Sequence, residues 1–211
     1  ILEKHIRSNG VEVHTGATAV KITEKGVVLS DGKVIEADIV LLATGVRPNT
    51  KLAADAGIEL GINGAIKVDN KMRTNIEDIY ACGDCTLQYH LVTGKPVYRP
   101  LGSTANKTGR IAGDSATGGS LEFRGVLGTA IFRIFGMTVA QTGLTQREAE
   151  ELGYNVAVCH LTKPDRPEFM GGRDMVIKGI ADKSDGRLLG VQIIGEQGVD
   201  KRLDVFATAI T

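Results

Sequence analysis

The chain has 211 residues, and its 25 lysines and arginines balance its 25 aspartates and glutamates. This neutral balance gives no whole-molecule field that would draw the protein to nucleic acid or to an acidic membrane, and no apolar run approaches the roughly 20 residues needed to span a bilayer. Its three cysteines are too sparse for a secreted disulfide framework and fit a reducing cytoplasm.

Both ends of the sequence suggest a piece of a longer protein. The first residue is Ile1, and the opening stretch ILEKHIRSNG reads as the tail of a helix that Gly10 ends. At the other end, apolar residues at helical spacing run toward Thr211 without a stop signal. We therefore expect that part of the chemistry lies outside this sequence.

The first fifty residues predict β structure after that short helix. β-branched runs separated by polar turns occupy residues 10–16, 18–38 and 38–45, and Ser30-Asp31-Gly32-Lys33 predicts a hairpin turn. Residues 39–42 are all apolar, which is typical of a central strand covered on both faces. That run ends in Gly45, at the strand edge where open α/β sheets bind ligands. A tight turn that needs glycine explains Gly45 equally well.

Residues 51–75 are predicted to form a connector, and a longer helix is predicted to follow before residue 120. KLAADAG (51–57) predicts a short helix, and residues 78–81 predict a short strand that leads into Gly83-Asp84. Pro100 stands just before a helix of small residues, where its missing N–H costs nothing.

The sequence after residue 120 predicts a separate α+β module. Residues 129–144 predict strands, and Thr145 with Glu148 forms the signature of a capping box at the start of a short helix that Gly153 ends. The last helix is expected to begin near residue 197. Three further strands are predicted before it: residues 154–161, 174–182 and 187–195.

Cys82 and Cys85 have the C-x-x-C spacing of metal and redox sites. A structural zinc site needs four ligands, and neither Cys159 nor the scattered histidines supply a second pair. A thioredoxin-like pair opens a helix, whereas the sequence after Cys85 is typical of a loop. We therefore favour an ordinary buried cysteine at Cys82 and predict no metal site.

Gly83 and Asp84, between these cysteines, have two explanations from the residues alone. A strand that ends in glycine lets the backbone close on a ligand, and the following carboxylate accepts hydrogen bonds from sugar-like hydroxyls. A structural Gly-Asp turn is equally compatible with the pattern.

Three blocks in this order resemble the pyridine nucleotide-disulfide oxidoreductases: ATGVRPNT (43–50), TNIEDIYACGDC (74–85) and RPLGSTANKTGRIAG (99–113). The resemblance is to the branch that contains NADH oxidase, NADH peroxidase and coenzyme A-disulfide reductase. Residues 123–145 and 187–207 are similar to that branch's C-terminal dimerisation domain.

The resemblance implies an α/β and α+β fold, the C-terminal part of a flavoprotein with two dinucleotide-binding domains. Residues 1–50 would be the end of the NAD-binding domain, and residues 51–120 the second part of the FAD-binding domain. Residues 121–211 would be the dimerisation domain.

The same resemblance implies roles at the cofactors. Asp84 would hydrogen-bond the ribityl chain of FAD, and Gly83 would give the chain room. The helix start would point its N–H groups and positive dipole end at the flavin pyrimidine ring, where negative charge develops on reduction. The FAD contacts there would be Pro100, Leu101, Gly102 and Ser103.

Contacts with NAD(P)H are implied for Gly45, Ala130 and Ile131. No catalytic residue is assigned within the chain, because the family's redox cysteine belongs to an N-terminal segment that this sequence lacks, as it lacks the G-x-G-x-x-G loops. The chain by itself is therefore expected to be inactive.

The implied activity is that of a homodimeric flavoprotein. NADH or NADPH would pass hydride to FAD, and a cysteine centre would then reduce a small molecule: a disulfide such as coenzyme A disulfide, a peroxide or oxygen. The partners expected are a second copy, bound through the C-terminal domain, and that substrate; nucleic acid and membrane are not expected. A non-catalytic dimerisation module and a monomeric ferredoxin-type reductase are the alternatives.

Overall fold

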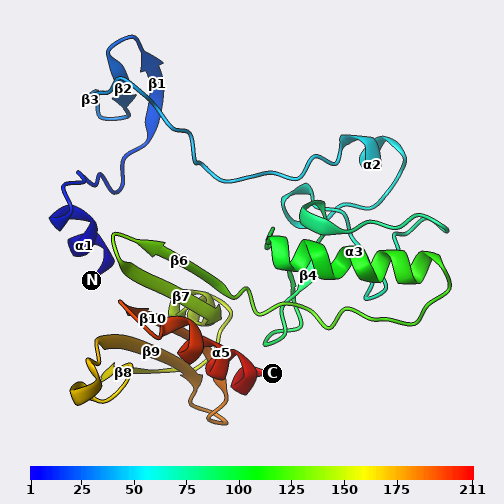
Figure 1. Cartoon of the computed structure of the whole chain (residues 1–211). Helices are drawn as coiled ribbons and strands as arrows, with labels where there is room; N and C mark the ends of the chain where they lie inside the picture. Colours follow the sequence, from blue (N-terminus) through cyan, green and yellow to red (C-terminus); the bar gives the residue numbers. More distant parts are fainter. The chain divides into compact units, whose positions relative to one another are not determined.

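The computed structural model describes all 211 residues and has a mixed α/β fold. The chain divides into two compact units, Ile1–Val46 and Arg47–Thr211 (Figure 1). No helix in either unit has the length and apolar character needed to cross a membrane.

The first unit contains one helix and a small antiparallel sheet in the order β1-β2-β3. The predicted hairpin turn is confirmed, because the Gly32 N–H donates to the Leu29 carbonyl at 2.9 Å. Gly26 is required where two strands meet: its φ is +131°, and a Cβ there would lie 2.0 Å from the Ile35 carbonyl oxygen. The elements are α1 (Leu2–Ser8), β1 (Ala19–Thr23), β2 (Gly26–Leu29) and β3 (Val34–Glu36).

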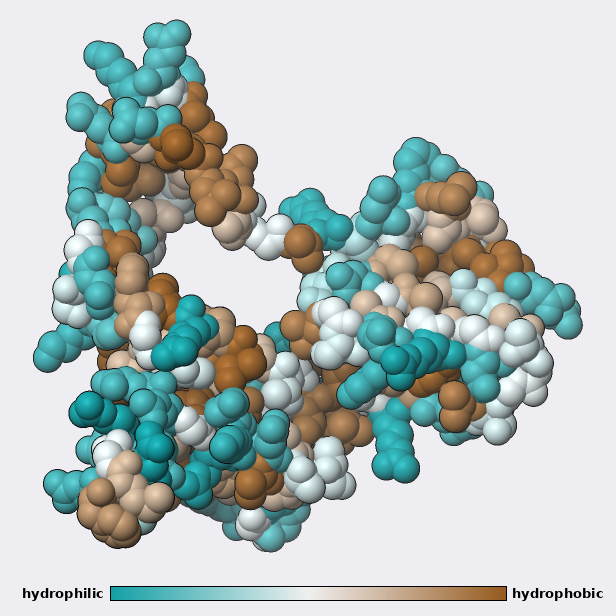
Figure 2. All heavy atoms as spheres, viewed as in Figure 1, coloured by the Kyte–Doolittle hydropathy of each residue, from teal (hydrophilic) through white to brown (hydrophobic).

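Two strands predicted in this unit are absent. Residues 10–16 form no strand, and residues 39–42 have no regular structure, with Ile39 88% exposed and Leu41 87% exposed. A central strand needs neighbours on both sides to pair its backbone groups, and this unit provides none beside residues 39–42. Apolar surface along the segment that leads out of the small sheet is visible in Figure 2.

The first part of the second unit carries the longest helix, α3 (Gly102–Ala116), which begins two residues after Pro100 as predicted. The predicted strand at 78–81 is reduced to an isolated bridge between Arg73 and Tyr80, because Asp78 has a φ of +60° that interrupts extended backbone. The other elements are α2 (Lys51–Asp55), η1 (Ile62–Gly64), η2 (Gly83–Cys85), β4 (Gln88–Tyr89) and β5 (Pro96–Val97).

Helix α3 is held by an apolar core on one of its faces. Ile111 packs with buried side chains from the connector, and Thr104 and Thr108 are buried on the same face. Their spacing of three and four residues is that of a single helix stripe. The buried residues of this core are Ala53, Ile66, Val68, Met72 and Ile111.

The second part of this unit is a five-stranded antiparallel sheet in the order β6-β7-β10-β9-β8, with helix α5 packed on β7 and β10 (Figure 1). The predicted strands and both helices are confirmed, including the capping box of Thr145 and Glu148. The elements are β6 (Ala130–Ile134), β7 (Met137–Gly143), α4 (Gln146–Glu151), β8 (Val156–Pro164), η3 (Glu168–Met170), β9 (Asp174–Asp182), β10 (Leu188–Gly195) and α5 (Val199–Ile210).

A two-residue backbone exchange joins the two parts of the second unit. The Leu91 N–H donates to the Val126 carbonyl, and the Val126 N–H donates to the Tyr89 carbonyl, both at 2.9 Å. The segment after α3 therefore runs beside β4 before it enters the large sheet. These hydrogen bonds attach the segment that enters the large sheet to the part of the unit that carries α3, so both parts belong to one compact unit.

Candidate functional site

The Gly83-Asp84 turn is fixed against the first half of α3. The Gly83 N–H donates to Thr108 Oγ1 at 3.0 Å, and Thr108 Oγ1 itself donates to the Thr104 carbonyl at 2.9 Å. Gly83 has a φ of +82°, a region that favours glycine, and a Cβ there would lie 3.9 Å from the Ala105 Cβ. The glycine is thus needed for the bend of the backbone rather than for space beside the helix.

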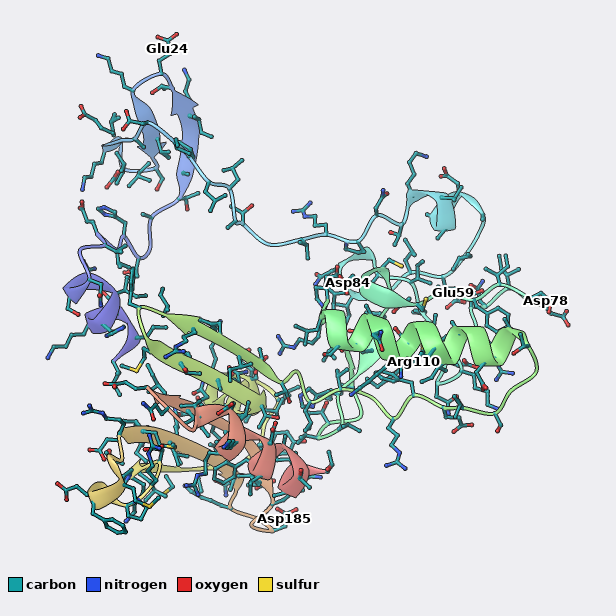
Figure 3. The ribbon with its side chains drawn as sticks, viewed as in Figure 1. Glu24, Glu59, Asp78, Asp84, Arg110 and Asp185 are labelled. Atoms are coloured by element: carbon teal, nitrogen blue, oxygen red, sulfur yellow. The ribbon has the colours of Figure 1, made fainter.

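The carboxylate of Asp84 is exposed and has neither a hydrogen bond nor an ion pair with the protein. Figure 3 shows Asp84 near the starting end of α3. Burial raises the pKa of Tyr98, and Asp84, followed by Cys85, adds to the effect. Asp84 is therefore free to accept hydrogen bonds from a bound hydroxyl.

The starting end of α3 has no side-chain cap. Its N-cap residue is Leu101, which offers no acceptor, and the first helical bond runs from the Ala105 N–H to the Leu101 carbonyl at 2.9 Å. The N–H groups of the first turn, at Gly102, Ser103 and Thr104, consequently have no capping side chain. Together with the dipole of a 15-residue helix, they favour negative charge at this end.

A hollow of about 330 Å³ opens where α3 begins, between the segment after α3 and the last turn of α5. Leu101 and Ser103, two predicted FAD contacts, line it together with Thr129. Ile131, predicted for NAD(P)H, lines a different hollow of about 970 Å³ at the start of α5. Gly45 belongs to the other unit.

The two cysteines that flank Gly83 and Asp84 form no disulfide. The Cys85 thiol donates a hydrogen bond to the Cys82 carbonyl at 3.3 Å. Burial raises the pKa of Cys85, and the neighbouring Cys82 and Asp84 add to the effect. A protonated thiol is a poor nucleophile, so this environment does not activate Cys85.

Sequence reasoning missed an ion pair beside the start of α3. The side chain of Arg99, directly before Pro100, pairs with Glu148 of α4. The backbone N–H of Arg99 donates to Gln88 Oε1 at 2.9 Å. Glu148 also accepts hydrogen bonds from the Thr145 N–H at 2.8 Å and Thr145 Oγ1 at 2.9 Å. The capping box could be predicted from local spacing, whereas no sequence pattern indicated that Glu148 pairs with Arg99, which lies far earlier in the chain.

The pKa of Glu148 lies below its usual value of 4.5. Burial alone would raise it, but the hydrogen bonds from Thr145 and Arg99, and the charge of Arg99, stabilise the carboxylate more strongly. The ion pair therefore tethers the loop that leads into α3 to the capped helix of the sheet domain.

His90 is a buried neighbour of this ion pair. Its Nδ1 accepts a hydrogen bond from the Val92 N–H at 3.2 Å, so the neutral ring carries its proton on Nε2. Nε2 has no partner of hydrogen-bond geometry, although the Leu127 carbonyl is near enough to favour its proton. Burial, followed by the charge of Arg99, lowers the pKa of His90, and Glu148 opposes this only in part.

Glu148→Gln tests the contribution of the ion pair. Glutamine retains the capping box but loses the charge, and both partners are partly exposed, so we expect a loss of at most about 1 kcal/mol in the free energy of unfolding at pH 7. Because the folded pKa is depressed, this contribution is present above pH 4.5 and is lost as the pH falls through the folded value.

Urea unfolding of the full-length protein across this pH range measures the effect, with the exposed pair Arg147–Glu151 as the control. Glu151→Gln should change the free energy of unfolding less than Glu148→Gln does. Equal losses in the two variants would show that the pair with Arg99 adds nothing specific.

Comparison with known proteins identifies the family. Residues 1–108, just over half of the chain, match the family described as pyridine nucleotide-disulphide oxidoreductase. The chain belongs to this family. Residues 129–211 match the family's dimerisation domain, which agrees with the α+β module that follows α3. The expectation of a resemblance to this family is thereby confirmed.

Two curated relatives in this family extend over the whole chain. The chain is 37% identical to the NAD(P)H sulfur oxidoreductase (CoA-dependent) of Pyrococcus furiosus and covers 48% of it. It is 35% identical to an NADH oxidase of Methanocaldococcus jannaschii and covers 47% of that protein. The chain thus spans about half the length of the curated relatives that it matches.

Solved structures of family members show the same fold. An NAD-dependent persulfide reductase from A. fulgidus matches 99% of this chain with a TM-score of 0.95 and 42% identity, over 40% of its own chain. A FAD-dependent pyridine nucleotide-disulphide oxidoreductase from Desulfovibrio vulgaris matches 99% of this chain with a TM-score of 0.87 and 36% identity, over 52% of its own chain.

Proposed function

We propose that the full-length protein is a homodimeric FAD-dependent oxidoreductase that takes electrons from NADH or NADPH. The observation that carries the proposal is the unpaired, exposed carboxylate of Asp84 beside the uncapped start of α3. The turn that carries Asp84 would supply an acceptor for the ribityl hydroxyls. The start of α3 beside it would supply N–H donors for the flavin ring. Membership of the family supports this reading.

Asp84 would accept hydrogen bonds from the ribityl chain, on the bend that Gly83 provides. FAD, when bound, would supply the chemistry of accepting hydride from the nicotinamide and passing the electrons on. The N–H groups at the start of α3 would stabilise negative charge on the pyrimidine side of the flavin. We assign this contact to Pro100, Leu101, Gly102 and Ser103.

The remaining assignments concern the NAD(P)H contacts and the domains of the longer protein. Gly45, Ala130 and Ile131 are proposed to contact NAD(P)H. Residues 1–50 would complete the NAD-binding domain, and residues 51–120 the FAD-binding domain, of the longer protein. Residues 121–211 would form the interface between two copies, since residues 129–211 match a dimerisation domain.

We propose a disulfide or persulfide of a small thiol, such as coenzyme A, as the electron acceptor. The P. furiosus relative is named as a CoA-dependent sulfur oxidoreductase, and the A. fulgidus structure as a persulfide reductase. Oxygen is the second candidate, because the M. jannaschii relative is named as an NADH oxidase. The transfer to sulfur would need a cysteine centre from outside residues 1–211.

Native mass spectrometry of the full-length protein tests the assembly. We expect two chains and two FAD molecules, and we expect anaerobic NAD(P)H oxidation to require coenzyme A disulfide or a coenzyme A persulfide. A flavin-free monomer would contradict the proposal. If NAD(P)H is oxidised only when oxygen is admitted, the flavoprotein assignment stands and oxygen replaces the disulfide or persulfide as the proposed electron acceptor.

A further inference from the structure

The polar side chain of Gln88, in β4, is almost completely buried. Only 1% of the residue is exposed, and both ends of its amide are bonded to backbone groups. Its Nε2 donates to the Thr86 carbonyl at 2.7 Å, and its Oε1 accepts from the backbone N–H of Arg99 at 2.9 Å. An amide satisfies both partners at once, which neither a carboxylate nor an aliphatic side chain can do.

The first of these bonds leads to the turn that carries Asp84. Thr86 is fully buried, and its Oγ1 donates to the Gly83 carbonyl at 2.9 Å. The other backbone group of this residue, the Gly83 N–H, donates to Thr108 Oγ1 of α3 at 3.0 Å. Two buried hydroxyls therefore hold both backbone groups of Gly83. The place of the next residue, Asp84, beside the starting end of α3 is thereby set (Figure 3).

The second bond leads to the start of α3. Arg99 directly precedes Pro100, and the helix begins at Gly102. The side chain of Arg99 pairs with Glu148 of α4, so the sheet domain holds this segment as well. Gln88 thus connects the two elements that we assign to the flavin, the turn at Asp84 and the segment that opens α3.

Every buried side-chain polar atom in this chain of hydrogen bonds has a partner, since the one buried atom without a partner is His90 Nε2. A satisfied buried network holds a single arrangement, because a displacement leaves a donor or an acceptor unpaired away from water. Neither Gln88 nor Thr86 lines the hollow at the start of α3. Both would therefore act on a bound group through their neighbours.

We propose that Gln88, together with Thr86, is a positioning residue for the flavin. It holds Asp84 and the first N–H groups of α3 in one fixed arrangement. The inference rests on the proposed function and deepens it. Without the amide, the turn and the helix start would shift relative to each other. The N–H groups would then stabilise the negative charge of the reduced flavin less well, which lowers the midpoint potential.

Gln88→Met in the full-length protein tests this role, because methionine has a similar size and makes neither hydrogen bond. We expect the affinity of the apoprotein for FAD to fall about tenfold. The midpoint potential of the bound flavin, measured anaerobically against reference dyes, should become more negative by about 30 mV, the equivalent of a tenfold change for a two-electron couple. Thr86→Val is the second variant and should move both quantities in the same direction.

Two controls separate positioning from a general loss of stability. Ile180→Val removes a methylene from the fully buried core of the sheet domain. It should lower the free energy of unfolding and leave the FAD affinity and the midpoint potential unchanged. Gln88→Met combined with Asp84→Asn should weaken FAD binding by clearly less than the product of the two single losses, because Gln88 acts in part through Asp84.

Wild-type FAD affinity and midpoint potential in both Gln88→Met and Thr86→Val would overturn the inference. Equal shifts in Ile180→Val, or losses that multiply fully in the double variant, would overturn it as well. If Gln88→Met does not fold, Thr86→Val and its combination with Asp84→Asn decide. These outcomes leave the proposed function standing as long as the wild type binds FAD and NAD(P)H reduces it. A wild-type protein that takes up no FAD contradicts the proposed function itself.

Discussion

Asp84→Asn in the full-length protein is expected to lower FAD affinity by about tenfold or more. A hydrogen bond to a charged acceptor contributes roughly 1.5–3 kcal/mol, and asparagine weakens it by removing the charge. Asp84 has no partner in the protein, so its replacement should disturb the ligand rather than the fold. The ratio of flavin absorbance to protein after gel filtration, followed by titration of the apoprotein with FAD, measures the loss.

Glu77→Gln is the matched control, because Glu77 is an exposed carboxylate seven residues earlier in the chain, between η1 and β4. It should retain flavin as the wild type does. Wild-type flavin content in Asp84→Asn would refute the assignment of this carboxylate. Equal losses in both variants would mean that negative charge in general, and not Asp84, governs retention.

Gly190→Ala is expected to destabilise the sheet domain by about 3 kcal/mol, the upper part of the range for overpacking. Gly190 lies in β10, where a Cβ would stand 2.0 Å from the Leu144 carbonyl oxygen and 2.7 Å from the Leu144 nitrogen. Both contacts are with backbone, so no side chain can move aside. Strand β10 is central in the sheet, between β7 and β9.

Gly179→Ala in the neighbouring strand β9 provides the comparison, since nothing lies within 4 Å of a Cβ at that position. There, alanine should be neutral or stabilise by up to about 1 kcal/mol, because it restricts the unfolded chain. Urea unfolding of the two full-length variants gives the difference. A Gly190→Ala protein as stable as Gly179→Ala would show that the backbone of Leu144 shifts easily and that its contact with β10 is not rigid.

Elements specified by neighbouring residues were predictable from the sequence. The hairpin at Ser30-Asp31-Gly32-Lys33 and the capping box of Thr145 and Glu148 each depend on contacts a few residues apart. The strands of the large sheet could be recognised from the alternation within each strand, although β7 and β10 pair across a long stretch of sequence. The Gly83-Asp84 pair was identified as a candidate site, although the residue pattern left a structural turn equally open, and only the resemblance favoured FAD.

Features that depend on distant or external partners were not predictable in this way. The apolar run at 39–42 has the composition of a central strand, yet a strand forms only where neighbours pair with it. The Arg99–Glu148 pair joins positions 49 residues apart. The amino-acid composition around these features is ordinary, so only the folded structure reveals them.

Anaerobic addition of NADH or NADPH to the full-length protein tests the central claim most directly. The purified protein, reconstituted with FAD if needed, is followed by the absorbance of oxidised flavin. The account predicts a yellow protein whose flavin is bleached by at least one of the two nucleotides, with one nucleotide consumed per bound FAD and one more for each oxidised cysteine centre. A protein that binds no FAD, or one whose bound flavin neither nucleotide reduces, would contradict it.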